Sequence, residues 1–546
     1  MFYKSPLLWN LQHQIFRFPY VSICLWLIPL LLFNSGEISL MAHDESLYAA
    51  RARLMFESGN WISPWENAHH KTPGFYWIIA IFYQLFGVSE ITARIPAMIA
   101  GILIIFVIYE IGKILLGEKL GYFSAAILSV EFLWLQYSRL VAPDIPTLLL
   151  VFTAILYLLK SESTPRYRYQ VKSQINYHFI VGLCFGLGFL MRSFMIFLPM
   201  IALLPYLIGE NYRHRHLSKP MLYVGFLVGL IPTFIWLLLS WRSYGGSSIG
   251  QLLEFVLHLG SREQHGNNIL FYIWNIPLKS FPWFLFAILG VVSVIRYPIR
   301  KYQLLLVGFP LVLFIEISLF PTRFSHYSLG IYPFIAMFAS LGLEWLGKMY
   351  QISRLGYLQS SLPRNFSYGF GILGLVFFLF GLIALLLDTL LGIQNIESYI
   401  ILAIIAGLSC LTIPAIWILR HHFNYKNLNA DAWICAWLFS AWLSIASAGI
   451  LGLLGNFNPD FKTFFQQETI TNITKNQPIH FVRWASKYAE LIYFYTPIPG
   501  KNVNEISELS PSEYAWIYTQ NPGNLNYKHK VIDSINDYEL IKILPQ

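Results

Sequence analysis

The chain has 546 residues, of which 56% are hydrophobic and only 12% are charged, and its mean hydropathy is +0.54. Soluble proteins carry roughly a quarter charged residues, so the composition excludes an ordinary soluble protein and indicates a polytopic membrane protein. The net charge is +9, but the basic residues cluster in short loops between apolar runs. That distribution is typical of membrane orientation and argues against nucleic-acid binding.

The apolar runs predict a multi-pass, all-α membrane domain with about thirteen transmembrane helices. About 20 helical residues are needed to cross the hydrocarbon layer. The expected spans are 19–36, 93–116, 120–139, 144–160, 178–191, 194–209, 221–241, 272–295, 303–320, 326–347, 367–391, 398–419 and 432–455. The first run lacks a small-residue cleavage site, so we interpret it as a retained helix and not as a removable signal peptide.

Loop charges predict the orientation of the chain. If the loops rich in Lys and Arg are cytoplasmic, every second loop is assigned, the N-terminus lies inside and the C-terminus lies outside. The segment 75–87 conflicts with this pattern if it crosses the membrane. Its apolar stretch is only about 13 residues, too short to span comfortably, so we predict an interfacial or re-entrant helix on the outer side.

The same topology divides the chain into two parts. Residues 1–455 form the membrane domain, and 37–92 and 242–271 are its long outer loops. Residues 456–546 lack long apolar runs and read as short strands and helices. We predict a small α/β extracytoplasmic C-terminal domain there, whose short strands and helices include 479–484, 513–518 and 540–544.

Two acidic stretches on the outer side are candidates for chemistry. Asp44 and Glu45 directly follow the first helix, and Asp144 lies at the outer end of a helical hairpin, beside Pro143. Acidic residues at a helix start can simply complement the helix dipole. Ionisable groups at membrane depth are costly, however, and are functional candidates by default. Two carboxylates on one face would suit a general base and its electrostatic partner.

Several cations also fall on the outer side, where the positive-inside rule predicts few. A phosphate group at the outer interface would account for them, because Arg and Lys bind phosphate through charge-assisted hydrogen bonds. Ordinary anionic headgroups are the alternative for any single residue. The residues in question are Arg192, Arg262, Arg323 and His326.

The order of the motifs resembles the GT-C glycosyltransferases, and among them the protein O-mannosyltransferases and the lipid A aminoarabinose transferases. The resemblance covers about residues 15–350. It is carried by Asp44-Glu45, Gly59-Asn60-Trp61, Lys71-Thr72-Pro73, Asp144-Ile145-Pro146, Gly188-Phe189-Leu190-Met191-Arg192, Phe281-Pro282-Trp283 and Arg323-Phe324-Ser325-His326-Tyr327. Thirteen spans followed by a small outer domain also look like the aminoarabinose-transferase branch.

The resemblance implies a sugar donor carried on polyprenyl phosphate and transfer on the non-cytoplasmic face, in a bacterial inner membrane. A lipid, a glycan or a protein would be the acceptor. By residue matching, Asp44 corresponds to the essential first-loop acid and Asp144 to the second. Lys71, Arg192 and Arg323 with His326 correspond to positions around the carrier phosphate. The chain departs from the family pattern at Thr72, Arg192 and Gly330; the first two departures keep the charge of their motifs, and none removes a carboxylate.

These residues support a coherent chemistry. Lys71 and Arg192 would stabilise the negative charge that develops on the leaving phosphate. If the acceptor is a hydroxyl, Asp44 would take its proton. If the acceptor is a phosphate, no base is needed and Asp44 would orient a substrate.

A metal ion and other functional classes remain alternatives. Imidazoles suit zinc, and some aminoarabinose-branch relatives bind zinc near the position of His70. Candidate ligands of a divalent metal are therefore His70, His258 and His265, although their spacing is not compact. A transporter, a flippase or a polymerase of envelope glycolipids is the competing interpretation. Transporters place ionisable residues near the midplane, whereas here they gather at one interface.

Overall fold

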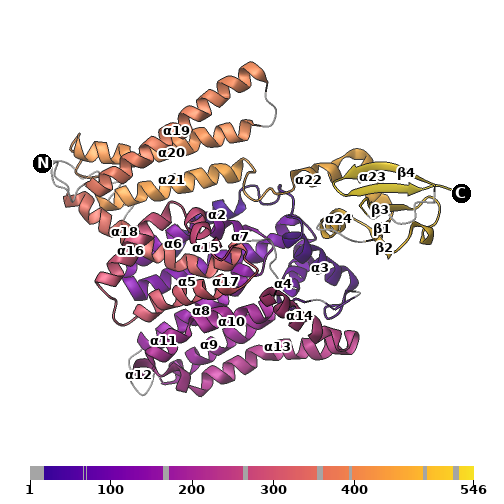
Figure 1. The fold of residues 1–546 in the computed structure, drawn as a ribbon, viewed down its shortest axis with the longest axis horizontal. Coiled ribbons are helices and arrows are strands. Elements are labelled where there is room, and N and C mark those ends of the chain that lie inside the picture. The colour runs from indigo at the N-terminus through magenta and orange to yellow at the C-terminus, as the bar shows by residue number, and fades with distance from the viewer. Residues whose placement is uncertain are drawn as a thin grey trace.

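The computed structural model describes residues 17–65, 67–68, 70–163, 171–261, 268–352, 361–392, 396–483, 488–520 and 528–545. Apolar helices form one bundle, and a small sheet extends from one end of it (Figure 1). This architecture confirms the predicted all-α membrane part with a C-terminal α/β part. We call the end of the bundle next to the sheet the sheet end, and the other the opposite end.

The helices before residue 456 follow one another with short connections. The longer ones are α2 (Pro19–Leu32), α3 (Asp44–Ser58), α4 (Gly74–Phe86), α5 (Glu90–Leu116), α6 (Glu118–Ser129), α7 (Phe132–Arg139), α8 (Asp144–Ser163), α9 (Val171–Arg192), α13 (Pro220–Tyr244), α14 (Ser247–Ser261), α15 (Phe271–Lys279), α16 (Trp283–Arg296), α17 (Phe309–Leu319), α18 (Tyr332–Ile352), α19 (Ser361–Leu391), α20 (Glu397–His421) and α21 (Ala430–Ile450). The short ones are η2 (Ser193–Ile196), α10 (Phe197–Ala202), α11 (Leu204–Gly209), α12 (Asn211–His214), η3 (His216–Ser218), η4 (Leu304–Gly308) and η5 (Ser325–Ile331).

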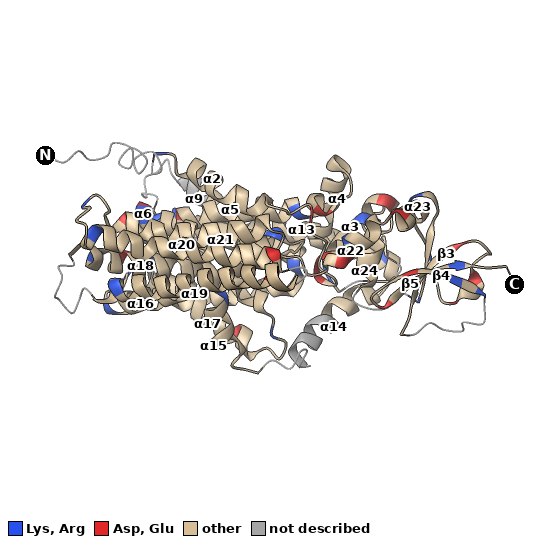
Figure 2. Cartoon of the chain, turned by 90° about the horizontal axis from the view of Figure 1, so that it is seen from above, with Lys and Arg blue, Asp and Glu red and all other residues tan. Residues whose placement is uncertain are grey.

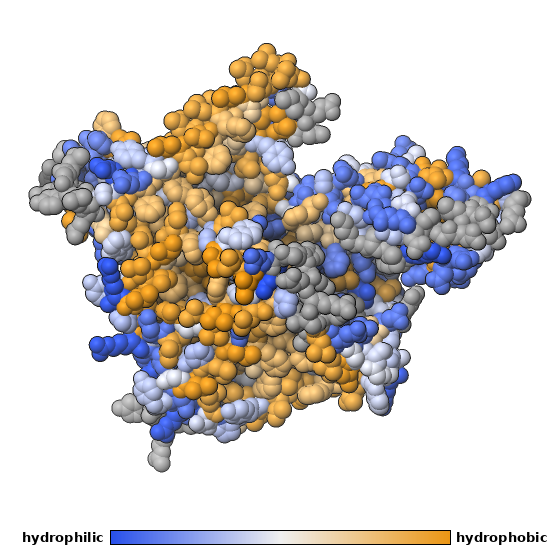
Figure 3. Space-filling view, viewed as in Figure 1, coloured by the Kyte–Doolittle hydropathy of each residue, from blue (hydrophilic) through white to orange (hydrophobic). Residues whose placement is uncertain are grey.

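The chain is a multi-pass membrane protein. Within the described residues, 8 helical stretches are long and apolar enough to cross a membrane, or up to 9 if the bent pair α15–α16 is one span. Apolar side chains cover the middle of the bundle surface (Figure 3), and charged residues gather toward its two ends and in the C-terminal part (Figure 2). Three further apolar helices are shorter: α2, α4 and the stretch 304–319. The total of about thirteen spans therefore stays a prediction.

The chain turns back after Arg192. By length and composition alone, 176–202 would be a single span. Arg192, however, pairs with Asp144 at the first residue of α8, and Arg213 pairs with Glu162 in its last turn. Helix α8 separates these two acids by about 27 Å. Because Arg192 and Arg213 pair with acids at opposite ends of α8, the chain between them must run back along the length of that helix. The prediction of two separate spans, 178–191 and 194–209, requires such a reversal.

Glycines bring neighbouring helices into close contact. A Cβ atom at Gly182 of α9 would lie 1.9 Å from the carbonyl oxygen of Leu222, and one at Gly225 of α13 would lie 2.0 Å from that of Phe179. The crossing of α16 and α18 is similar, because a Cβ at Gly290 would meet the Phe338 carbonyl oxygen at 1.9 Å. Helix packing in membranes depends on such small residues.

The C-terminal part contains α22 (Pro459–Gln466), α23 (Glu468–Asn476), α24 (Ala489–Tyr495) and a five-stranded sheet in the order β2-β1-β3-β5-β4. The strands are β1 (Ile479–Val482), β2 (Pro499–Val503), β3 (Tyr514–Tyr518), β4 (His529–Ile535) and β5 (Tyr538–Ile543). Strand β1 is parallel to β2 and β3, whereas β3, β5 and β4 are antiparallel. Three strands match the predicted segments. The sequence did not reveal β2 and β4, because both are largely exposed and lack an apolar run.

Helix α3 joins the C-terminal part to the bundle. It packs against α4 on one side and α24 on the other. The Arg53 guanidinium of α3 is buried. It donates hydrogen bonds to backbone carbonyls in the last turn of α24 and directly after it. These carbonyls belong to Tyr493, Phe494, Thr496 and Pro497, at 3.3, 2.9, 2.9 and 2.7 Å. The position of α3, whose first residue is Asp44, is therefore set from both sides.

Candidate active site

A cavity of about 780 Å³ opens at the sheet end of the bundle. Its walls come from the start of α3, the loop before α4, the α7–α8 connection, the end of α9 and η5. The lining residues are Met41, His43, Asp44, Glu45, Leu47, Tyr48, Arg51, His70, Lys71, Thr72, Tyr137, Leu140, Ala142, Pro143, Asp144, Met191, Arg192, Ser193, Met195, Phe324, His326 and Tyr327. Seven of the candidate catalytic, phosphate-binding and metal-binding residues are among them: Asp44, Glu45, His70, Lys71, Asp144, Arg192 and His326.

Asp44 is the accessible acid of the cavity. It is the first residue of α3, after His43, whose positive φ of 72° makes a sharp entry into the helix. The Asp44 side chain is 52% exposed, and its Oδ1 lies 3.5 Å from the His43 Nδ1. Burial raises the pKa of Asp44, but the hydrogen bond from His43 and the charges of His326 and Lys71 outweigh that effect and leave the pKa below its usual value. Asp44 is therefore ionised at neutral pH.

Glu45 differs sharply from its neighbour, because its side chain is completely buried. Both carboxylate oxygens accept hydrogen bonds from the guanidinium of Arg94, at 2.9 and 2.8 Å. The backbone N–H groups of Met41 and Val141 donate to the same carboxylate, at 2.8 and 2.9 Å. Glu45 thus ties α3 to α5 and to the α7–α8 connection.

Asp144 and Arg192 form an ion pair that also lines the cavity. Asp144 begins α8 and its side chain is 5% exposed, whereas that of Arg192, at the end of α9, is 21% exposed. The Arg192 guanidinium carbon also lies 5.9 Å from the centre of the Tyr327 ring. The ion pair with Asp144 and the contact with the Tyr327 ring together fix the orientation of the Arg192 guanidinium.

Lys71 lies beside this pair because its loop packs tightly on the end of α9. The Thr72 hydroxyl donates to the Phe189 carbonyl at 3.2 Å, and a Cβ at Gly74 would come within 2.7 Å of the Leu190 carbonyl oxygen. The Lys71 ammonium lies 4.3 Å from the centre of the Tyr48 ring. Burial lowers the pKa of Lys71 to about 8, with Asp44 opposing and Arg192 adding to the decrease.

The cavity also contains two of the predicted histidines. The His326 Nδ1 is 3.0 Å from the Tyr137 hydroxyl. Burial, together with the charges of Lys71 and Arg51, lowers the pKa of His70 to about 3, so that this imidazole is neutral at pH 7. A neutral imidazole has a lone pair available for a metal ion.

Other predicted residues are located elsewhere. Arg323 is not among the described residues that line the cavity: its guanidinium donates to the carbonyls of Ser318 and Pro321, which end α17. Binding of the carrier phosphate by Arg323 stays a prediction. Arg262 and His265 lie outside the described residues. His258 belongs to α14, and its side chain is likewise outside the description.

Several cavity residues were not recognised in the sequence. Tyr48 and Arg51 lie four and seven residues after Asp44, so the helical period places them on the same face of α3. Periodicity could have identified both. Tyr137 contacts His326 and Tyr327 contacts Arg192; Tyr327 belongs to a motif quoted from the sequence but was given no role there. Glu490 of α24 is not a lining residue, but its carboxylate lies 3.5 Å from the lining residue Arg51, and no sequence signal would have revealed it.

The arrangement favours an anionic substrate group next to an accessible carboxylate. Two of the three lining carboxylates are engaged by guanidinium groups, Glu45 by Arg94 and Asp144 by Arg192. Asp44 is the exposed one. Lys71 and Arg192 supply positive charge at the same wall, which suits a phosphate. The apolar side chains of Met191 and Met195 border the same space.

Parts of the chain are similar to known proteins. Residues 70–239 match the family model of the dolichyl-phosphate-mannose-protein mannosyltransferases. The undecaprenyl phosphate-alpha-4-amino-4-deoxy-L-arabinose arabinosyl transferase of Pseudomonas savastanoi pv. phaseolicola is 29% identical over 34% of this chain and 34% of its own length. A second enzyme of that name, from Pseudomonas fluorescens, is 26% identical over 47% of this chain and 49% of its own length. The matches thus span half or less of these relatives.

Solved structures extend the likeness to the whole fold. The crystal structure of ArnT from Cupriavidus metallidurans bound to undecaprenyl phosphate has a TM-score of 0.71, with 15% identity and 97% of both chains covered. The Archaeoglobus fulgidus oligosaccharyltransferase with a tethered acceptor peptide has a TM-score of 0.51, with 13% identity, covering 89% of this chain and 64% of its own. The chain is therefore similar in part of its sequence to mannosyl- and arabinosyltransferases, and it has the same fold as the solved ArnT structure.

Proposed function

We propose that the chain is an integral membrane glycosyltransferase that moves a hexose or pentose from a polyprenyl-phosphate carrier to a lipid, glycan or protein acceptor. The observation that carries the proposal is the meeting of Asp44, Lys71, the Asp144–Arg192 pair and His326 in one cavity. These residues come from widely separated parts of the chain. The undecaprenyl phosphate in the names of the curated relatives supports the same class of donor here.

The carrier phosphate would lie against Lys71 and Arg192. Cleavage of the bond between the anomeric carbon and the phosphate oxygen leaves a phosphate with increased negative charge, and these two cations stabilise it. The apolar wall at Met191 and Met195 suits the first part of a polyprenyl chain. His326 lies near the same charges and would contribute to orienting the phosphate.

Asp44 would act on the acceptor. A hydroxyl acceptor loses its proton to Asp44 while its oxygen attacks the anomeric carbon. A phosphate acceptor is already ionised, and Asp44 would then orient the sugar or the acceptor. Glu45, which is saturated with hydrogen bonds, holds the start of α3 and so positions Asp44.

We place the cavity and the C-terminal part on the extracytoplasmic side of a bacterial plasma membrane, with the N-terminus in the cytoplasm. Loop charge supports this orientation. Attachment of a fluorescent maleimide to a cysteine introduced at the exposed position Lys530 in intact cells tests it. Labelling only after the membrane is made permeable would reverse the assignment.

Asp44→Asn tests the function. Because Asp44 is exposed and has few contacts, the variant should fold, insert and lose at least about 100-fold in transfer rate if it is the general base. Asp533→Asn, in an exposed stretch of β4, is the control. Transfer is followed by mass spectrometry of envelope lipids and glycoproteins from a deletion strain carrying each variant.

The same experiment separates the alternatives. Loss of one specific sugar from the deletion strain, restored by the wild-type chain and not by Asp44→Asn, identifies the sugar and the acceptor together. An unchanged envelope together with altered uptake or export of a solute would favour a transporter. Normal transfer by Asp44→Asn would overturn the role of this carboxylate.

A further inference from the structure

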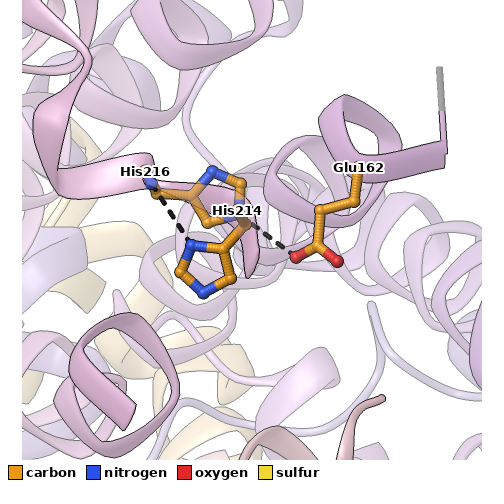
Figure 4. A group of neighbouring side chains, drawn as sticks. All are labelled: Glu162, His214 and His216. Carbon is orange, nitrogen blue, oxygen red and sulfur yellow. Dashed lines mark hydrogen bonds and ion pairs between the residues drawn. The ribbon is translucent and has the colours of Figure 1, made fainter. Parts of the chain in front are cut away.

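A second group of ionisable side chains lies at the opposite end of the bundle, away from the cavity. Glu162 is in the last turn of α8, His214 ends α12 and His216 begins η3. One ligand atom from each of the three lies within 4.8 Å of the others, and the close-up shows both imidazoles beside the carboxylate (Figure 4). Glu162 is about 27 Å along α8 from Asp144, so this group is separate from the proposed reaction.

The local backbone brings the two imidazoles together. Arg215, between them, adopts a left-handed conformation with φ of 54°. Non-glycine residues reach this region rarely and at some cost. The turn stacks the rings of His214 and His216, with centres 4.0 Å apart and planes inclined by 17°. The His-Arg-His sequence thus presents two imidazoles toward one carboxylate.

The distances already approach those of a metal site. His216 Nε2 lies 3.2 Å from Glu162 Oε1. Two ligands of a tetrahedral zinc ion, with bonds of about 2.0–2.1 Å, are separated by about 3.3 Å. These two atoms therefore need almost no movement to bind one ion. The ligand atom of His214 lies within 4.8 Å of these two and would have to move closer.

The surrounding hydrogen bonds orient the imidazoles for binding. The Tyr206 carbonyl lies 3.2 Å from His214 Nε2 and can only accept, so that this nitrogen carries the proton and Nδ1 has the lone pair. The His216 backbone N–H donates to this Nδ1 at 3.2 Å, and a bound ion would replace that hydrogen bond. On the far side of His216, Nδ1 is 3.0 Å from His178 Nε2. Metal-bound histidines typically donate their second ring N–H to such a partner.

We propose that Glu162, His214 and His216 bind one zinc ion, with His178 as the hydrogen-bond partner that orients His216. Two imidazoles and one carboxylate are a ligand set that zinc prefers, and a water would complete the tetrahedron. On binding, His216 keeps its proton on Nδ1 and donates it to His178 Nε2, while Nε2 binds the ion. Arg213 pairs with Oε2 of Glu162. The other oxygen, Oε1, accepts a hydrogen bond from the Tyr206 hydroxyl and lies beside His216 Nε2, and it is the oxygen that would bind the ion.

The ion would connect three elements that meet at this end: α8, the returning segment that ends at α12, and η3. Such a link supports the chain reversal between α9 and α13 and does not touch the reacting groups. The site therefore acts on stability. The proposal is independent of the proposed transfer reaction, because activity is not its readout.

Zinc content tests the proposal directly. The full-length chain, purified in detergent and dialysed with zinc chloride and then against zinc-free buffer, should retain one zinc per chain by inductively coupled plasma mass spectrometry. His216→Ala and Glu162→Gln should lose it. His178→Gln should bind zinc about 10–100-fold more weakly, as partners of ligating histidines do. His422→Ala, a histidine of the same end outside this group, should retain one zinc.

A second measurement covers variants that fail to fold. Zinc chloride should raise the melting temperature of the metal-free wild-type chain, and the shift should be smaller for His178→Gln, whose substitution removes no ligand. His70→Ala separates this group from the cavity. Zinc that is lost in His70→Ala but kept in Glu162→Gln would overturn the proposal. So would a wild-type chain that neither retains zinc nor melts at a higher temperature in its presence.

Discussion

Asp44 and Glu45 are adjacent in the sequence and have opposite environments. The Asp44 side chain is 52% exposed to the cavity, and that of Glu45 is completely buried against Arg94. The difference arises because successive side chains of a helix point about 100° apart, so one faces the cavity and the other faces α5. A reactive carboxylate must meet its substrate, and Glu45 can influence transfer only through the position of α3.

Glu45→Gln should therefore destabilise the fold. The substitution leaves the buried Arg94 guanidinium without its counter-charge, and breaking a buried pair from one side costs about 3–5 kcal/mol. Thermal unfolding of the purified chain measures the loss. Glu37→Gln, at a side chain that is 79% exposed, is the control and should leave the melting temperature nearly unchanged. An unfolding temperature of Glu45→Gln equal to that of the wild type would contradict the positioning role.

Lys71 predicts a pH dependence of transfer. Burial lowers its pKa to about 8, so the ammonium loses its charge as the pH rises through about 8. The neutral amine cannot attract phosphate, and kcat/KM for the donor should fall above that pH. Lys71→Arg keeps its charge and should move the fall to higher pH. If wild type and variant lose activity over the same pH range, Lys71 is not the group responsible.

At the scale of elements, the α9–α13 crossing is the tightest contact near the hairpin that carries Arg192. Glycine at 182 and 225 lets the two backbones touch. The reversal after Arg192 uses Ser193, with φ of 53°. Together these features hold the end of α9 against the cavity, where Arg192 meets Asp144.

Gly225→Ala should separate the two helices. Its Cβ would lie 2.0 Å from the Phe179 carbonyl oxygen, and overpacking of this kind costs about 1–3 kcal/mol. The melting temperature of the purified chain should fall. Gly369→Ala in α19, where a Cβ meets nothing within 4 Å, is the matched control and should be neutral or slightly stabilising. If both variants melt at the same temperature, the α9–α13 crossing accommodates the added methyl group and the prediction is wrong.

At the scale of the whole molecule, the C-terminal part completes the surroundings of the cavity. Glu490 of α24 reaches Arg51, and Tyr495 donates to Glu90 at the start of α5, at 3.2 Å. Lys462 also lies 3.4 Å from Glu90. The sheet is therefore attached to the same helices that carry the candidate acid and its neighbours.

Arg53→Ala should weaken this attachment. Four buried or half-buried carbonyls lose a charged donor, which we expect to cost on the order of 2–4 kcal/mol. Transfer should decrease as well, because α3 carries Asp44. Thermal unfolding and transfer assays measure the two effects, with Lys530→Ala on an exposed part of β4 as the control. If the Arg53→Ala chain is less stable but transfers sugar at the wild-type rate, the C-terminal part does not contribute to the position of Asp44.

Much of the candidate site could be predicted, because its residues stand in short motifs beside apolar runs. Asp44, Lys71, Asp144, Arg192 and His326 all reach the cavity. Arg323 was different, since a motif shows that a cation is present but not where its guanidinium points. The metal-type group at the opposite end escaped notice because Glu162 is more than 50 residues from His214 and His216 in the chain.

The sequence by itself determined that this chain lies in a membrane, where its helices fall and which polar residues interrupt them, because hydrophobicity and helix length are local properties. Only the tertiary structure decided which of those polar residues meet. Glu45 is buried by Arg94 and Asp44 is exposed beside Lys71, because helix packing, and not spacing along the chain, sets which charges are neighbours.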